Sequence, residues 1–139
     1  MVDHITTVDV LERVAVYSAM RMKKRVSDTL DESVELFKAV ADPVRLRLLN
    51  LLAAGEVCVC HLHEALDLPQ STVSRHLAYL RTRGLVVGRK EGLWVHYRLA
   101  KPTGELHRKL MGCLGACSEE IEALTQDRQR LEGRTCCGG

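Results

Sequence analysis

The sequence contains few aromatic residues, and this scarcity constrains its core. Only 4% of the 139 residues are Phe, Trp or Tyr, whereas 46% are hydrophobic. The core must therefore be built mainly from Leu, Val and Ala, which favours packed helices over a β-sandwich. A chain of this length suits a single domain.

The chain also lacks long apolar runs and a strong charge of one sign. No stretch approaches the roughly 18 apolar residues that indicate a membrane helix, so we expect no membrane partner. Glu12 and Arg13 interrupt the place where the apolar part of a secretion signal would lie, so we expect a cytoplasmic protein. The net charge of +2 does not by itself indicate nucleic-acid binding. Residues 67–99, however, contain six Arg and Lys against two acidic residues, which forms a basic patch.

Cysteine is plentiful, although the motifs of thiol enzymes are missing. The six cysteines form three close pairs: Cys58 with Cys60, Cys113 with Cys117, and Cys136 with Cys137. In a cytoplasmic protein we expect thiols rather than structural disulfides. Neither a Cys-x-x-Cys motif nor a Cys-x5-Arg loop occurs, so we do not expect an enzyme. A metal-buffering protein would not need the DNA-reading elements described next.

Hydrophobic periodicity predicts a mainly α-helical domain. Apolar residues recur at helical spacing over four segments, residues 31–42, 43–54, 57–66 and 70–83. Pro43 suits a first helical position, and Gly84 suits a helix end. The short break at 67–69 between two helices is typical of a helix-turn-helix.

A small β-hairpin and a long helix follow. Residues 85–87 and the alternating residues 93–99 predict two strands around a turn at 90–92, which form a wing. One helix over 103–131 would carry an apolar stripe that a second copy of the chain can bury. The fold class is therefore a winged helix-turn-helix, dimeric with terminal helices at the interface. The expected parts are an N-terminal helical arm (1–29), the DNA-binding domain (30–102), a dimerisation helix (103–131) and a flexible Cys-containing tail (132–139).

The predicted helix 70–83 has the composition of a base-reading helix. Val73, Leu77 and Leu80 form its buried face, which leaves the polar residues for a DNA groove. Small hydroxyls near its N-terminus can approach bases closely, while Arg and Gln can pair with guanine and adenine. Basic residues at the wing tip can contact phosphates. For His76, packing beside Tyr79 is an equal alternative. The candidate DNA-binding residues are Gln70, Ser71, Thr72, Ser74, Arg75, His76, Arg89 and Lys90.

Several stretches resemble the ArsR/SmtB family of metal-responsive winged-helix repressors. They are residues 36–46, 56–62, 74–77, 89–92 and 94–99. The resemblance covers residues 31–102. It implies a homodimer that binds operator double-stranded DNA and releases this DNA when metal binds. Within the family, the box Cys58-Val59-Cys60 resembles the arsenic and antimony branch. That branch usually carries a third cysteine at the position where this sequence has His63.

The chemistry of the box supports a soft ion as the inducer. Thiolates select soft ions, so Cys58 and Cys60 are the primary candidate ligands for As(III) or Sb(III). Residues i and i+2 of a regular helix point about 200° apart. We therefore expect that binding strains or unwinds residues 57–62 and displaces the helix 70–83. Cys113 and Cys117 are explained equally well by packing. The possible additional ligands are Cys113, Cys117 and His63.

Two alternatives keep the fold and change the signal. His61 or His63 together with Cys58 and Cys60 would suit Zn(II) or Cd(II), because imidazole binds zinc well. The cysteines could instead form a thiol redox or persulfide switch. The two tail cysteines could bind a metalloid or be spectators.

Overall fold

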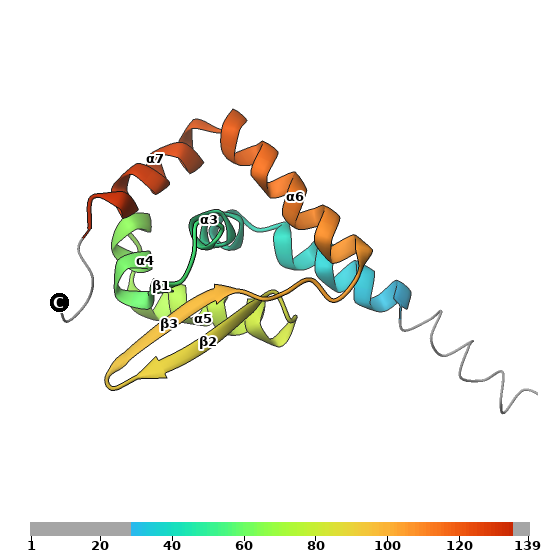
Figure 1. The fold of residues 1–139 in the computed structure, drawn as a ribbon, viewed down its shortest axis with the longest axis horizontal. Coiled ribbons are helices and arrows are strands. Elements are labelled where there is room, and N and C mark those ends of the chain that lie inside the picture. Colours follow the sequence, from blue (N-terminus) through green and yellow to red (C-terminus); the bar gives the residue numbers. More distant parts are fainter. Residues whose placement is uncertain (1–28, 135–139) are drawn as a thin grey trace, which may run out of the picture. The chain divides into compact units, whose positions relative to one another are not determined.

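The computed structural model describes residues 29–134. The chain divides into two compact units after Glu35. Residues 29–35, the described part of the first unit, are helical. The second unit contains the labelled helices and strands of Figure 1. The arm predicted over 1–29, apart from residue 29, lies outside the described residues, as do the two tail cysteines.

Helix α3 (Pro43–Leu52) is the centre of the second unit. The Asp42 carboxylate caps it by accepting a hydrogen bond from the Arg45 backbone N–H at 3.0 Å, and Pro43 occupies the first turn. Its second half is buried from Leu48 to Leu52. The prediction of a core helix starting at Pro43 is confirmed, and the helix ends two residues before the expected position.

Helices α4 (Val59–Leu66) and α5 (Gln70–Thr82) form the helix-turn-helix. Asp67 between them has a φ of 54°, a left-handed conformation that ends α4 and redirects the chain. The predicted apolar face of α5 is fully buried; it consists of Val73, Leu77 and Leu80.

Three antiparallel strands form the sheet, in the order β1-β3-β2. The strands are β1 (Val57–Cys58), β2 (Val86–Glu91) and β3 (Trp94–Leu99). The β2–β3 hairpin is the predicted wing, and its tight turn uses Gly92 with a φ of 60°. The turn comes later than expected because β2 extends to Glu91. The sequence does not predict strand β1, whose pairing with β3 sets Cys58 opposite His96.

The C-terminal part contains two helices where the sequence predicts one. Helix α6 (Glu105–Glu120) and helix α7 (Glu122–Glu132) are separated by Ile121, whose φ of −103° and ψ of 110° are extended. The prediction of one continuous helix over 103–131 is therefore wrong. Helix α7 turns back and packs against α3 and α4 (Figure 1).

One apolar cluster joins these elements, and Tyr97 is the aromatic residue that it buries. Aliphatic side chains supply most of the rest, as the low aromatic content predicts. Its fully buried members include Leu48, Leu51, Leu62, Val73, Leu77, Leu80 and Leu85. Within residues 29–134, no helix combines the length and apolar character that a membrane crossing requires.

Candidate metal centre and nucleic-acid interface

Cys58 and Cys60 lie on either side of the start of α4. Cys58 ends β1 and is the N-cap residue of the helix, with an extended backbone at φ −70° and ψ 143°. Cys60 lies in the first helical turn, and the two Sγ atoms are 2.9 Å apart. The expectation that the side chains diverge by about 200° is wrong, because the pairing of β1 with β3 keeps Cys58 out of the helix.

The described cysteines differ in their chemical state. Cys58 is buried, Cys113 is exposed and Cys117 is half-buried, and all three are free thiols. Cys60 is disulfide-bonded, which departs from the expectation that every cysteine is a thiol.

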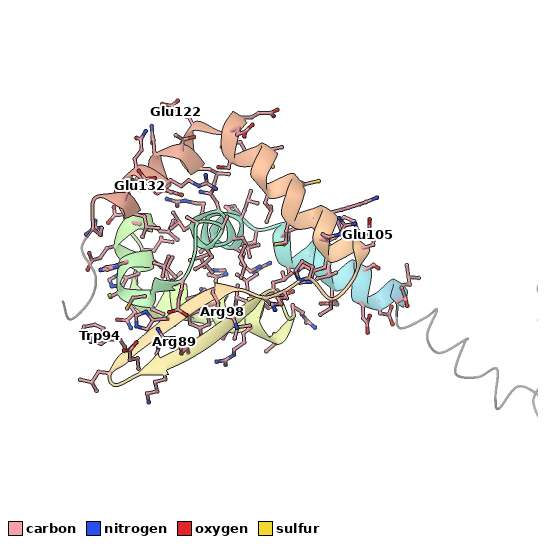
Figure 2. The ribbon with its side chains drawn as sticks, in the orientation of Figure 1. Arg89, Trp94, Arg98, Glu105, Glu122 and Glu132 are labelled. Carbon is pink, nitrogen blue, oxygen red and sulfur yellow. The ribbon has the colours of Figure 1, made fainter. Side chains whose placement is uncertain are left out.

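The sulfur pair borders a cavity of about 300 Å³ between α4, α5 and the wing. Gln70 and Ser74 line it from α5. The wing contributes Leu93, Trp94, Val95 and Tyr97. Figure 2 shows Trp94 on the wing together with Arg89 and Arg98. The cavity therefore joins the sulfurs to the elements expected to contact DNA.

The sequence pattern does not predict that the wing lines this cavity beside the cysteines. The alternation over residues 93–99 indicates that two faces exist, but it does not indicate which face meets the cysteines. The β1–β3 register decides that, because it sets Val57 opposite Tyr97 and Cys58 opposite His96.

The structure does not bring the possible additional ligands to the sulfur pair. His63 Nδ1 lies 3.3 Å from the Leu68 carbonyl oxygen, and the ring lines a second cavity. Cys113 and Cys117 lie on α6. Among residues 29–134, no three His, Cys, Asp or Glu side chains are close enough together to hold a metal ion.

The start of α5 presents the predicted DNA-contacting face. Gln70, Ser71 and Arg75 are exposed, whereas Thr72 and Ser74 are half-buried. No side chain caps the N-terminus of α5, so its first amide groups can face an anion such as a phosphate.

His76 is half-buried on α5, and its ring contacts residues at the start of α3. Its Nδ1 lies 3.5 Å from Arg45 Nη1 and 3.8 Å from Asp42 Oδ2. Burial lowers the pKa of His76, although Asp42 opposes this. Arg45 in turn lies over the Tyr79 ring, with its Cζ 4.3 Å from the ring centroid. These contacts join α5 to the start of α3 and favour packing over phosphate contact for His76.

The wing carries one paired and one exposed basic residue. Arg89 donates to Glu56 at 2.6 Å (Nη2 to Oε1) and to Glu91 at 2.8 Å (Nη1 to Oε2), while Lys90 is exposed. The hydrogen bond to Glu56 is the main cause that raises the pKa of Arg89, and Arg89 in turn lowers the pKa of Glu56. Glu56 directly precedes β1, so this pair ties the cysteine segment to the wing. No local pattern could predict it, because the partners are 33 residues apart.

Known proteins resemble this chain in sequence. The profile described as "Bacterial regulatory protein, arsR family" matches residues 42–87. The arsenical resistance operon repressor of Escherichia coli is 41% identical over 107 residues, which cover 76% of this chain and 89% of that protein. The chain belongs to the ArsR family. The ArsR-family regulator ArsR2 of Pseudomonas putida, an arsenic resistance transcriptional regulator, is 36% identical over 110 residues, covering 74% of this chain and 96% of its own.

Solved structures share the winged-helix fold of this ArsR-family chain. Reduced HlyU from Vibrio cholerae has a TM-score of 0.59 and 31% identity, covering 71% of this chain and 98% of that chain. A homodimeric winged helix-turn-helix domain of a possible ArsR-family regulator from Mycobacterium bovis has a TM-score of 0.58 and 34% identity, covering 69% and 86%. The ArsR-family chain is therefore a transcriptional repressor with a DNA-binding fold, and not an enzyme.

Proposed function

We propose that this repressor is a cytoplasmic homodimer that holds operator double-stranded DNA and releases it when As(III) or Sb(III) binds Cys58 and Cys60. The observation that carries the proposal is the 2.9 Å separation of the two Sγ atoms beside a cavity shared with α5. The names of two relatives, an arsenical resistance operon repressor and an arsenic resistance regulator, support the choice of ion.

The sulfur pair fits one small soft ion. In a tetrahedral zinc site with Zn–S bonds of about 2.3 Å, two sulfurs lie roughly 3.8 Å apart. Sulfurs 2.9 Å apart can therefore share one ion after a small movement. Cys58 and Cys60 would hold the ion as thiolates, which soft ions prefer to oxygen ligands.

Three connections couple the sulfur pair to the DNA-contacting elements. The backbone of Cys58 pairs with the wing strand β3. The Glu56–Arg89 ion pair links the preceding residue to strand β2. Gln70 and Ser74 of α5 line the cavity beside the sulfurs. Occupying this cavity therefore acts on both DNA-contacting elements, and a coupling of about 1.4 kcal/mol already changes DNA affinity tenfold.

A fluorescence-anisotropy titration on a short palindromic duplex tests the proposal. Reduced wild-type protein bound to the duplex is challenged with As(III), Sb(III), Cd(II) and Zn(II) in turn. We expect As(III) and Sb(III) to release the DNA. The variant Cys58→Ser/Cys60→Ser should bind the duplex with unchanged affinity and should no longer respond, because neither ligand remains.

The exposed thiol Cys113 provides the matched control. Cys113→Ser removes one cysteine outside the cavity, so release by As(III) should be unchanged. Full As(III)-induced release from Cys58→Ser/Cys60→Ser would contradict the proposal. Release by Cd(II) or Zn(II) alone would mean that one of these ions, and not As(III) or Sb(III), is the inducer. The DNA-binding role would remain.

A thiol redox switch is the second candidate, and the disulfide at Cys60 favours it. In that case a peroxide accepts two electrons from two thiols, a disulfide forms, and the peroxide is reduced to water. Adding peroxide to the same anisotropy assay separates the two signals. Release by peroxide without release by As(III) would favour the redox switch.

A further inference from the structure

The cavity beside the sulfur pair determines what a bound arsenic atom can carry. Cys58 is only 4% exposed, and it lines the cavity of about 300 Å³ together with Cys60. Trivalent arsenic forms three bonds, and two of them can go to these sulfurs, whose Sγ atoms are 2.9 Å apart. The third bond holds a group that has to be accommodated next to the sulfur pair. The lining of the cavity therefore indicates which arsenicals fit.

The wing gives this cavity an apolar side. Leu93, Trp94, Val95 and Tyr97 contribute to its lining, and Trp94 begins strand β3 near the end of the wing (Figure 2). Among the described residues that line the cavity, none carries a charge at neutral pH. A charged or strongly hydrated group would lose water here without an ionic partner. The lining therefore favours an uncharged, apolar group on arsenic.

Two of these wing side chains are large apolar groups that remain open to solvent. Leu93 is 94% exposed and Trp94 is 42% exposed. Covering apolar surface is favourable roughly in proportion to the area removed from water. An aromatic group can in addition stack on the Trp94 indole or meet it edge to face. An apolar substituent on arsenic would supply this cover, whereas the hydroxyl of arsenite would not.

The cavity is also large enough for an aromatic ring. Its volume of about 300 Å³ is the space available beside the sulfurs. An apolar protein cavity of about 150 Å³ already binds one benzene molecule. A phenyl group on arsenic therefore fits by volume, and so does the smaller methyl group.

We propose that this cavity selects trivalent arsenicals with one organic substituent, which bond to Cys58 and Cys60 and place the substituent against Trp94 and Leu93. This inference rests on the proposed function and names the class of its inducer. An arsonous acid, R–As(OH)2, exchanges two hydroxyls for two thiols and releases two waters, so arsenic stays trivalent. The disulfide at Cys60 is reduced beforehand by a phosphine, which takes oxygen from water and leaves two thiols.

Three arsenicals form a graded series for the test. Arsenite carries a hydroxyl at the third position, methylarsonous acid carries a methyl group, and phenylarsine oxide carries a phenyl group. Each is titrated into full-length protein that has been reduced with a phosphine, because a phosphine adds no competing thiol. Calorimetry measures the affinity, and release of the fluorescent duplex gives the concentration for half-maximal response.

The variant Trp94→Ala should lose affinity for phenylarsine oxide by about tenfold or more, because the ring loses its apolar and aromatic contact. Its affinity for methylarsonous acid should fall by less than about fourfold, since a methyl group covers less surface. Its affinity for arsenite should be unchanged, which also shows that the variant is folded. Trp94→Phe keeps an aromatic ring and should retain most of the affinity for phenylarsine oxide.

Val87→Ala is the matched control. Val87 is an apolar residue of the same hairpin, on β2, and it is 37% exposed without lining the cavity. This variant should match the wild type with all three arsenicals. A selective loss for phenylarsine oxide in Val87→Ala would overturn the assignment of the substituent to the cavity.

The fluorescence of wild-type protein gives an independent reading. Trp94 is the single tryptophan of the chain, so the emission comes from the residue that the substituent should contact. At saturation, phenylarsine oxide should change the emission more than arsenite does. An equal change would place the phenyl group away from the indole and overturn the inference.

The outcomes separate this inference from the proposed function. No loss for phenylarsine oxide in Trp94→Ala, or an equal loss for all three arsenicals, overturns the selection of organic substituents. The proposed function survives that result if arsenite still releases DNA from the wild type and not from Cys58→Ser/Cys60→Ser. If Cys58→Ser/Cys60→Ser responds normally to arsenite and phenylarsine oxide, the proposed function itself fails.

Discussion

His107 is a buried residue whose ring has one unpartnered nitrogen. The side chain is 3% exposed, and its Nε2 has no hydrogen-bond partner. Its Nδ1 accepts a hydrogen bond from the Thr103 backbone N–H at 3.3 Å, which serves the start of α6 where Gly104 provides no capping side chain. Burial lowers the pKa of His107 below 6.5, so the folded protein keeps this ring neutral.

The lowered pKa predicts a loss of stability in mild acid. Below pH 6.5 the unfolded chain binds a proton at His107 more readily than the folded chain does, so stability falls as the pH falls through the folded-state pKa. The variant His107→Asn keeps an acceptor for the Thr103 N–H and removes the titration. Urea midpoints at about pH 7.5 and about pH 5 should therefore differ less in the variant than in the wild type.

His76 also has a lowered pKa, so some acid sensitivity should remain in His107→Asn. An acid-induced shift of equal size in the two proteins would contradict the role of His107. A variant destabilised equally at both pH values would indicate lost packing alone.

Helix α7 is attached to α3 by a charge pair whose acidic member is buried. Asp127 is fully buried, and it accepts hydrogen bonds from Arg47 Nε and Nη2, both at 2.8 Å. This bond is the main cause that raises the pKa of Arg47. Asn50, also on α3, donates to the Leu124 carbonyl oxygen at 3.0 Å. These contacts orient α7 on α3.

Breaking the pair should destabilise the protein strongly. Asp127→Ala removes the carboxylate that accepts two hydrogen bonds from Arg47, whose side chain is 27% exposed, so we expect a loss of about 1.5–3 kcal/mol. The apolar double variant Arg47→Met/Asp127→Leu should recover much of that free energy. Urea denaturation of the three proteins provides the measurement. A loss below roughly 1 kcal/mol in Asp127→Ala would mean that the pair contributes no more than an exposed salt bridge.

Local sequence patterns predict those helices and strands whose defining residues lie within or next to them. Pro43 marks the start of α3, and the buried face of α5 follows from the spacing of its apolar residues. The wing follows from alternation around Gly92. Each of these signals lies within a few residues of the element that it defines.

The structure differs from the sequence prediction where contacts between distant segments of the chain decide the conformation. A two-residue strand has no periodicity, so β1 could not be predicted, and the position of Cys58 outside α4 depends on its pairing with His96. The apolar stripe continues through Ile121, so sequence favours one helix. The bonds from Arg47 and Asn50 to α7 span more than seventy residues, as the Arg47–Asp127 separation of 80 shows.

At the scale of the whole molecule, the small net charge conceals an uneven distribution. The chain carries +2 in total, while residues 67–99, which contain α5 and the wing, have six basic and two acidic residues. On the wing, Arg89 is already paired with Glu56 and Glu91. The exposed Lys90 is therefore the better candidate for a phosphate contact. A homodimer would present each such contact twice.

The number of these phosphate contacts can be obtained from the salt dependence of operator binding. Each phosphate contact contributes about 0.9 to the slope of log K against log salt concentration on B-form DNA. Lys90→Ala removes one wing contact per chain, so a symmetric dimer should lose about 2 from the slope. Lys109→Ala is the matched control, because Lys109 lies on α6 beside Glu105 and should leave the slope unchanged. Anisotropy titrations over a series of salt concentrations provide the slopes. A decrease of about 1 would mean that only one wing touches DNA, and no decrease would place Lys90 away from the phosphates.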